Sequence, residues 1–249
     1  MPLAQAIATT FLHRPYIFLF LVGFLISSLL NMRGRRTVLF LVIGYSIALI
    51  SEASSIRNGF PYGHYFYLYE NMPGELMVFG VPVWDSLSYV FMAYASLATA
   101  EYFCRDRSRM IRTIFSASLL MVALDVLADP LALRGDQWFL GKIYGYAEPG
   151  FYFGIPFSNF AGWFLVATAI FSVFYYFQTS PHSPSLALPH AQSRGKEGVL
   201  GPLLYASLVL FNLILTVMIK EYWLAASGLL VVTTTFSLVV FLCRRRRQN

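Results

Sequence analysis

Seven long hydrophobic stretches, separated by shorter polar segments, dominate the chain. A helix needs about 20 apolar residues to cross the hydrocarbon core of a membrane. The pattern therefore predicts an all-α integral membrane protein, with residues 1–249 forming one polytopic domain that is a single bundle of about seven transmembrane helices. The expected spans are Tyr16–Met32, Val38–Ser55, Val81–Ala100, Ile111–Ala128, Phe157–Phe177, Leu200–Ile219 and Tyr222–Leu242.

The composition supports this class. Hydrophobic residues make up 57% of the chain and charged residues only 12%, whereas soluble domains average about 25% charged residues. The net charge of +6 does not indicate a nucleic-acid partner, because the basic residues lie in short loops between apolar spans. Cys104 and Cys243 form neither a disulfide framework nor a zinc motif, so we interpret them as small interfacial residues.

The distribution of basic residues predicts the orientation. Alternate loops carry 5 Lys and Arg residues on one side and 13 on the other. The richer side is expected to be cytoplasmic, which puts the N-terminus outside and the C-terminus inside a bacterial or archaeal cytoplasmic membrane. Residues 178–199, rich in Ser, Pro and His, are predicted to be a flexible cytoplasmic loop, with His182 and His190 exposed to solvent.

Two loops on the other side are long, aromatic and interrupted by Gly and Pro. They contain Gly59–Tyr67 and Trp138–Tyr146. Because such apolar loops are unfavourable in water, we expect them to fold back and cap the outer end of the bundle. The alternative is an ordinary belt of aromatic residues at the membrane interface.

Four carboxylates lie within or at the ends of the apolar stretches: Glu52, Asp85, Asp125 and Asp129. A charge in hydrocarbon costs ~2.5–3.5 kcal/mol on insertion scales, which makes each residue a functional-site hypothesis. The predicted topology gathers all four at the outer ends of their helices. Asp125 and Asp129 share one helix face, one turn apart.

Three of the acids also have a structural interpretation. The pair Asp129-Pro130 can end a helix, and Asp125 can pair with Arg57 or Arg134. Asp85 lies in a first helical turn, where the helix dipole favours an anion. Asp125, well inside its span, is the hardest to explain in this way.

Several carboxyl groups in a dry pocket cannot all ionise, and one that stays neutral is a competent general acid. Aromatic rings nearby can line an apolar slot and stabilise a cation. This combination suits protonation of an apolar alkene followed by capture by water. The candidate substrate-binding residues are Tyr62, His64, Tyr65, Trp84, Tyr89, Glu148, Tyr152, Asn159 and Trp163.

Other chemistries fit less well. A membrane di-iron enzyme needs histidine clusters, but the four histidines here are scattered. A retinal protein needs a lysine in the last helix, and Tyr222–Leu242 has none. A Mg²⁺ site on Asp125 and Asp129 is a weaker alternative, because a second Asp-rich motif is missing.

At these residues the chain resembles the carotenoid biosynthesis membrane family, whose best-known members are carotenoid 1′,2′-hydratases of the bisanhydrobacterioruberin hydratase type. The resemblance runs from the second to the fifth span and is specific as an ordered set. It rests on Glu52 followed by Asn58–Tyr67, on Gly80–Trp84, on Asp125–Pro130 and on Tyr152–Trp163.

The resemblance implies addition of water across the terminal C1′=C2′ bond of an acyclic carotenoid, without a cofactor. Asp125 or Asp129 is the expected acid, and Glu52 or Asp85 would position or deprotonate the water. The expected partners are a lipophilic carotenoid, water, the bilayer and other carotenoid enzymes. Two alternatives stay open: a cyclase or other acid-initiated isoprenoid enzyme, and a non-catalytic proton-coupled transporter or pigment-binding protein.

Overall fold

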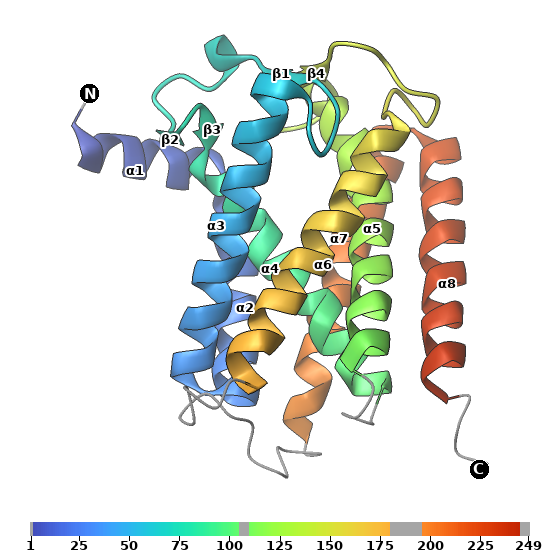
Figure 1. The fold of residues 1–249 in the computed structure, drawn as a ribbon. Coiled ribbons are helices and arrows are strands. Elements are labelled where there is room, and N and C mark those ends of the chain that lie inside the picture. The colour runs from blue at the N-terminus through green and yellow to red at the C-terminus, as the bar shows by residue number, and fades with distance from the viewer. Residues whose placement is uncertain (1, 105–109, 180–195, 245–249) are drawn as a thin grey trace.

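The computed structural model describes residues 2–104, 110–179 and 196–244, and a helix lies at each of the seven predicted segments. A further helix, α1 (Leu3–His13), precedes them and lies across the bundle axis in Figure 1. The seven long helices are α2 (Pro15–Met32), α3 (Gly34–Asn58), α4 (Val83–Phe103), α5 (Met110–Leu133), α6 (Phe157–Thr179), α7 (Leu200–Met218) and α8 (Tyr222–Arg244).

Six of these helices are long and apolar enough to cross a membrane, and α4 is the exception. Its serines, tyrosines and acidic residues lower its mean hydropathy. It is nevertheless the central helix, packed against α2, α3, α5 and α7 and buried without interruption from Tyr89 to Leu97. Polar residues are tolerated in α4 because neighbouring helices cover it.

The loops at one end of the bundle form a layer that we call the loop-covered end, made of residues 59–82 and 134–156. It contains two antiparallel strand pairs: β1 (Tyr65–Tyr67) with β4 (Tyr144–Tyr146), and β2 (Met77–Val78) with β3 (Val81–Pro82). Short 3-10 turns lie at Tyr69–Asn71 and Gly135–Gln137. In Figure 1 this layer covers the ends of α3 and α5.

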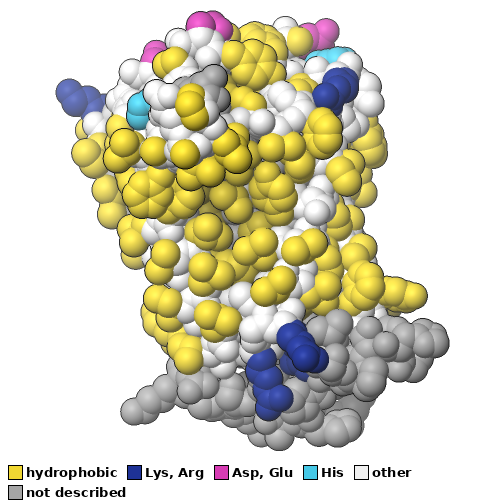
Figure 2. All heavy atoms as spheres, turned by 90° about the vertical axis from the view of Figure 1, so that its left-hand side faces the viewer, with side chains coloured by type: hydrophobic (Ala, Val, Ile, Leu, Met, Phe, Trp, Pro, Cys, Tyr) yellow, Lys and Arg dark blue, Asp and Glu magenta, His cyan; other side chains and the backbone are white. Residues whose placement is uncertain are grey.

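The distribution of hydrophobic and charged side chains on the surface is that of a membrane protein. Figure 2 shows hydrophobic side chains over the middle of one face, with charged side chains confined to the two ends. Helix α1 exposes Leu3, Ile7, Phe11 and Leu12. Such exposed apolar area is favourable in lipid and unfavourable in water.

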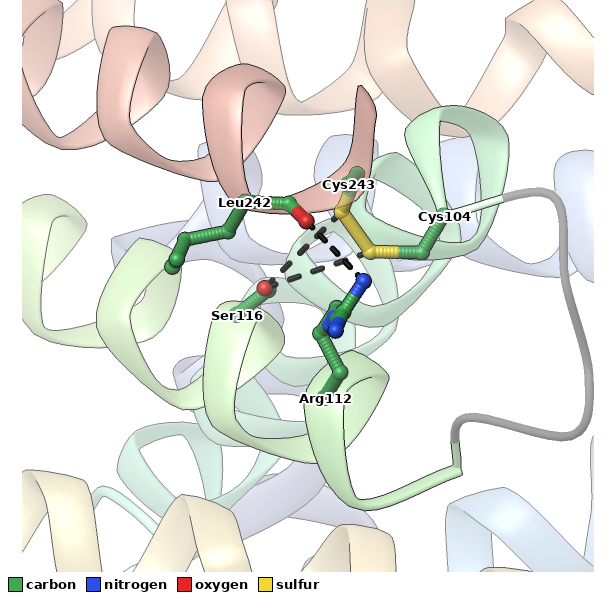
Figure 3. The surroundings of a disulfide bond; sticks show 5 residues. All are labelled: Cys104, Arg112, Ser116, Leu242 and Cys243. Carbon is green, nitrogen blue, oxygen red and sulfur yellow. Dashed lines mark hydrogen bonds between the residues drawn. A yellow bond between two sulfur atoms is a disulfide. The ribbon is translucent and has the colours of Figure 1, made fainter. Parts of the chain in front are cut away.

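The interpretation of the cysteines as unpaired interfacial residues is wrong. Cys104 and Cys243 form a disulfide between the ends of α4 and α8, 139 residues apart in sequence, as Figure 3 shows. Close by, the Arg112 guanidinium donates a 3.1 Å hydrogen bond to the carbonyl of Leu242. Sequence spacing carried no signal for this pair, because packing of the helices brings their ends together.

The predicted flexible segment 178–199 is described only at its edges. Residues 178 and 179 belong to α6, and Lys196–Val199 form a 3-10 turn before α7. His182 and His190 lie outside the described residues.

Candidate functional site

A pocket lies inside the bundle beneath the loop-covered end and contains about 990 Å³ of space between its lining atoms, including its mouth. All four carboxylates line it, and so do six of the nine predicted substrate-binding residues. These ten residues are Glu52, Asp85, Asp125, Asp129, Tyr62, Tyr65, Trp84, Tyr89, Asn159 and Trp163.

Helical spacing explains how distant residues meet. On α4, Asp85, Ser88 and Tyr89 line the pocket, and on α5, Asp125 and Asp129 do the same. Residues three and four positions apart share one face of a helix, so each helix presents a polar edge to the same space.

The first acidic cluster joins α5 to α6. The Asn159 side-chain nitrogen donates to Asp125 Oδ2 at 2.8 Å and to Asp129 Oδ2 at 2.9 Å, so one amide bridges the two acids. Asp125 is fully buried and Asn159 is 2% exposed. Asp125 Oδ1 has no hydrogen-bond partner among the described residues.

Strand β4 completes this cluster. The hydroxyl groups of Tyr144 and Tyr146 both donate to Asp129, the latter at 2.8 Å to Oδ2. Residues two apart on a strand point to the same side, which aims both rings at one carboxylate. Burial raises the pKa of both tyrosines well above the ordinary value, and the Asp129 charge raises it further. Both hydroxyls therefore remain protonated donors.

The second acidic cluster joins α3 to α4 through strand β1. The Tyr67 hydroxyl lies 2.6 Å from Asp85 Oδ2 and 3.4 Å from Glu52 Oε2, which also lies 3.4 Å from the Ser86 hydroxyl. Burial raises the pKa of Tyr67 well above its ordinary value, and Asp85 and Glu52 add to the shift. Tyr67 is thus held as a neutral donor between two acids.

Aromatic rings form the wall between the clusters. Tyr89 and Trp163 stack at 4.1 Å between ring centroids, and Tyr62 lies 6.1 Å from the Tyr89 ring. The Tyr62 hydroxyl pairs with Ser51 at 2.8 Å. A side chain at Gly162 would collide with the Tyr62 ring and with Pro61, so glycine there allows the loop to approach α6.

Two of the three structural interpretations, those of Asp129 and Asp125, are wrong, and the one for Asp85 is confirmed. Helix α5 continues through Pro130 to Leu133, so Asp129-Pro130 does not end it. Arg134 pairs with Glu221 at 2.7 Å, and Arg57 bonds the carbonyls of Ala53 and Phe79. Neither arginine reaches Asp125. Asp85 does lie in the first turn of α4.

Three predicted substrate-binding residues lie away from the pocket. His64 and Glu148 are exposed on the loop layer, and the Tyr152 hydroxyl contacts Ser227 of α8 at 3.2 Å. None of the three lines the pocket. Their positions in sequence are close to pocket residues, but the turns of the loops direct them elsewhere.

Sequence reasoning missed Glu75, which lies in a loop and not in an apolar stretch. Its carboxylate is buried and pairs with Arg14 at 2.8 Å. It also accepts a hydrogen bond from the Trp84 indole, and Arg14 lies over the Trp84 ring at 4.7 Å. Arg14 also donates a hydrogen bond to the carbonyl of Leu140 at 2.6 Å. This group fixes Trp84 in the pocket wall and ties both loops to the start of α2.

Metal binding by the Asp pair gains no support from the contacts. The described residues contain no group of three or more His, Cys, Asp or Glu side chains arranged to hold an ion. Three of the four Asp125 and Asp129 oxygens instead accept N–H or O–H donors.

The fold and the site together define an integral membrane protein with an acid-lined aromatic pocket. A family model described as "Carotenoid biosynthesis protein" matches residues 13–235, and the chain belongs to this family. It is 30% identical over 143 residues to bisanhydrobacterioruberin hydratase of Haloarcula japonica, a match that covers 57% of this chain and 45% of that protein. No solved structure matches.

Proposed function

We propose that the protein hydrates the terminal C1′=C2′ double bond of an acyclic carotenoid end group. Its family and the hydratase relative support a carotenoid substrate. The pocket supports the reaction, because it combines apolar walls, carboxyl groups and neutral hydroxyl donors. The observation that carries the proposal is the unpartnered Asp125 Oδ1.

Asp125 is the proposed acid. A buried carboxylate without a cation would leave a charged oxygen unpaired, which is costly. A neutral carboxyl group solves this problem: Oδ2 accepts the Asn159 bond, and Oδ1 carries the proton and offers it to the pocket. Asp129, which receives bonds from Asn159, Tyr144 and Tyr146, is suited to remain ionised.

The reaction then needs one water molecule and no oxidant or reductant. Asp125 transfers its proton to C2′, and the electron pair of the double bond forms the new C–H bond. The resulting tertiary cation at C1′ faces the rings of Tyr89 and Trp163, whose π-faces stabilise positive charge. Water adds to C1′ and loses a proton to Asp85 or Glu52, from which it returns to Asp125.

The proposal includes a topology. All seven helices α2 to α8 cross the membrane, with the loop-covered end outside and the arginine-rich end in the cytoplasm. The carboxylates then lie near the outer surface. Asp85 and Asp129 are partly exposed within the pocket, so they are the acids that water reaches first.

The test is expression of Asp125→Asn in a bacterium that produces an acyclic carotenoid. The substitution keeps the shape of the side chain and removes the acid. We expect wild-type protein to add the mass of one water, and D125N to leave the substrate unchanged. Asp136→Asn is the matched control, because Asp136 is an exposed acid outside the pocket.

The product distinguishes the alternatives. An isomer of unchanged mass would indicate cyclisation, which begins with the same protonation. Full hydration by correctly folded D125N would refute Asp125 as the acid. Unchanged substrate with the wild-type protein would favour a transport or pigment-binding role.

A further inference from the structure

Part of the pocket lining, which we call the apolar arm, takes no part in the proposed chemistry. It consists of Phe91 and Met92 of α4 together with lining residues of α2 and α7. Both helices pack against α4 and against each other. The arm contains no carboxylate, so the pocket is polar at one end and apolar at the other.

Several lining residues of this arm on α2 and α7 are not fully buried. Phe20 of α2 and Phe211 and Asn212 of α7 line the pocket and are partly exposed. The opposite wall is closed, because Tyr62 is 2% exposed and Asn159 is 2% exposed. Partly exposed lining residues thus lie on both α2 and α7, on a surface that faces lipid in the proposed topology.

Aromatic rings of α2, α4 and α7 contact one another at this position. Phe20 and Phe211 meet edge to face at 5.3 Å between centroids, and Tyr16 stacks on Phe211 at 5.6 Å. Phe20 also contacts Phe91, inside the pocket, at 5.6 Å. Aromatic side chains of this kind separate by rotamer changes, which are fast compared with turnover.

We propose that the polyene tail of the substrate passes through a lateral opening between α2 and α7, with Phe20 and Phe211 on its two sides. Seven residues separate Asp85 from Met92, which is about 10 Å of helix. A carotenoid is much longer than this arm, so only its end group fits inside. The tail must leave the protein where the walls are apolar and the surroundings are lipid. This inference rests on the proposed function.

Water alone would then enter the pocket through the loop-covered end. Its tyrosine hydroxyls and the partly exposed Asp85 and Asp129 give that side a polar path. Water and the apolar tail would reach the same acids from different directions. This separation keeps the end group at the carboxylates while excess water stays out of the apolar arm.

The experiment compares two substrates in purified protein. One is a full-length acyclic carotenoid, and the other is a truncated analogue with the same end group and a single further isoprene unit. Asn212→Trp narrows the opening. Leu210→Trp is the control, because Leu210 is its neighbour on α7 but is 57% exposed and lies outside the pocket.

We expect N212W to lower kcat/KM for the carotenoid by about tenfold or more, and to leave the short analogue within about twofold of wild type. L210W should leave both substrates unchanged. Phe211→Ala removes a ring from the opening and should restore carotenoid turnover when combined with N212W, which separates blockage from misfolding.

The outcomes separate this inference from the proposed function. Hydration of both substrates by wild-type protein, with equal losses or no loss in N212W, would overturn the lateral opening alone. Hydration of neither substrate by wild-type protein would overturn the proposed function and, with it, the opening. A loss of kcat/KM in N212W that is confined to the full-length carotenoid supports both the lateral opening and the proposed function.

Discussion

Asn159 is the residue whose replacement tests the acid cluster most directly. Its side-chain nitrogen bridges Asp125 and Asp129 with hydrogen bonds of 2.8 and 2.9 Å, and all three residues line the pocket. Asn159→Leu has a similar shape and donates neither bond. Asp125 then loses the contact that fixes its Oδ2, while the surroundings of its unpartnered Oδ1 stay the same.

The magnitude follows from the change in charge during the reaction. Before proton transfer the bond to neutral Asp125 is worth ~1 kcal/mol, and afterwards it joins a charged acceptor, where such bonds are worth ~1.5–3 kcal/mol. The difference of ~0.5–2 kcal/mol arises only as the charge develops in the transition state. Its loss lowers kcat by about 2–30-fold, with KM nearly unchanged. Folding stability falls by about 2–4 kcal/mol, because both bonds are lost.

The assay is steady-state hydration by purified protein, with the thermal midpoint measured in parallel. Asn71→Leu is the control: it loses one side-chain bond, to the Lys142 carbonyl at 2.7 Å, in an exposed part of the loop layer. A folded N159L protein with kcat equal to wild type would refute the reasoning. An equal decrease of kcat in N71L would refute it as well.

Three further predictions concern the loop layer and the opposite end. The pKa of Tyr146 is raised in the folded state, which favours the neutral hydroxyl there. The free energy of unfolding should therefore hold up to a pH of about 10 and fall above it. Thermal midpoints across this range should show the decline, and Tyr146→Phe should make the decline smaller. Glu75→Gln should cost about 3–5 kcal/mol in unfolding free energy, because it leaves the Arg14 charge buried without its partner. The double variant Arg14→Met, Glu75→Leu should recover part of that loss in a detergent denaturation titration. Cys104→Ser should leave hydration unchanged, since Cys104 lies about 28 Å of helix from Asp85, and a thiol-labelling assay should then find Cys243 reactive.

Much of the helical architecture was predictable from hydrophobic pattern alone. A helix lies at each expected segment, and α5 extends to Leu133 because Pro130 is accommodated within it. The four acids were predictable as a group, since their cost in hydrocarbon marks them wherever they occur. The predicted topology then places all four at the same end of the bundle.

The partners of these acids were not predictable in the same way. Tyr67 meets Tyr144 only because β1 pairs with β4, and three-residue strands this far apart in sequence leave no usable pattern. Glu75 gave no signal because it lies in a loop and not in an apolar stretch. Its partner Arg14 precedes the first predicted span, yet it is 3% exposed. Long-range packing decides all of these contacts.

Helix α4 has a consequence for how the chain enters the bilayer. Some of its hydroxyl groups bond within the helix, as Ser96 does to the carbonyl of Met92 and Thr99 to that of Ala95. In the proposed topology, its low hydropathy nevertheless makes it the least favourable span to insert alone. Its acids find their donors on other segments, as Asp85 does in Tyr67. In the proposed topology, membrane integration of α4 is therefore a cooperative step, which depends on helices already released into lipid and on α5 synthesised after it.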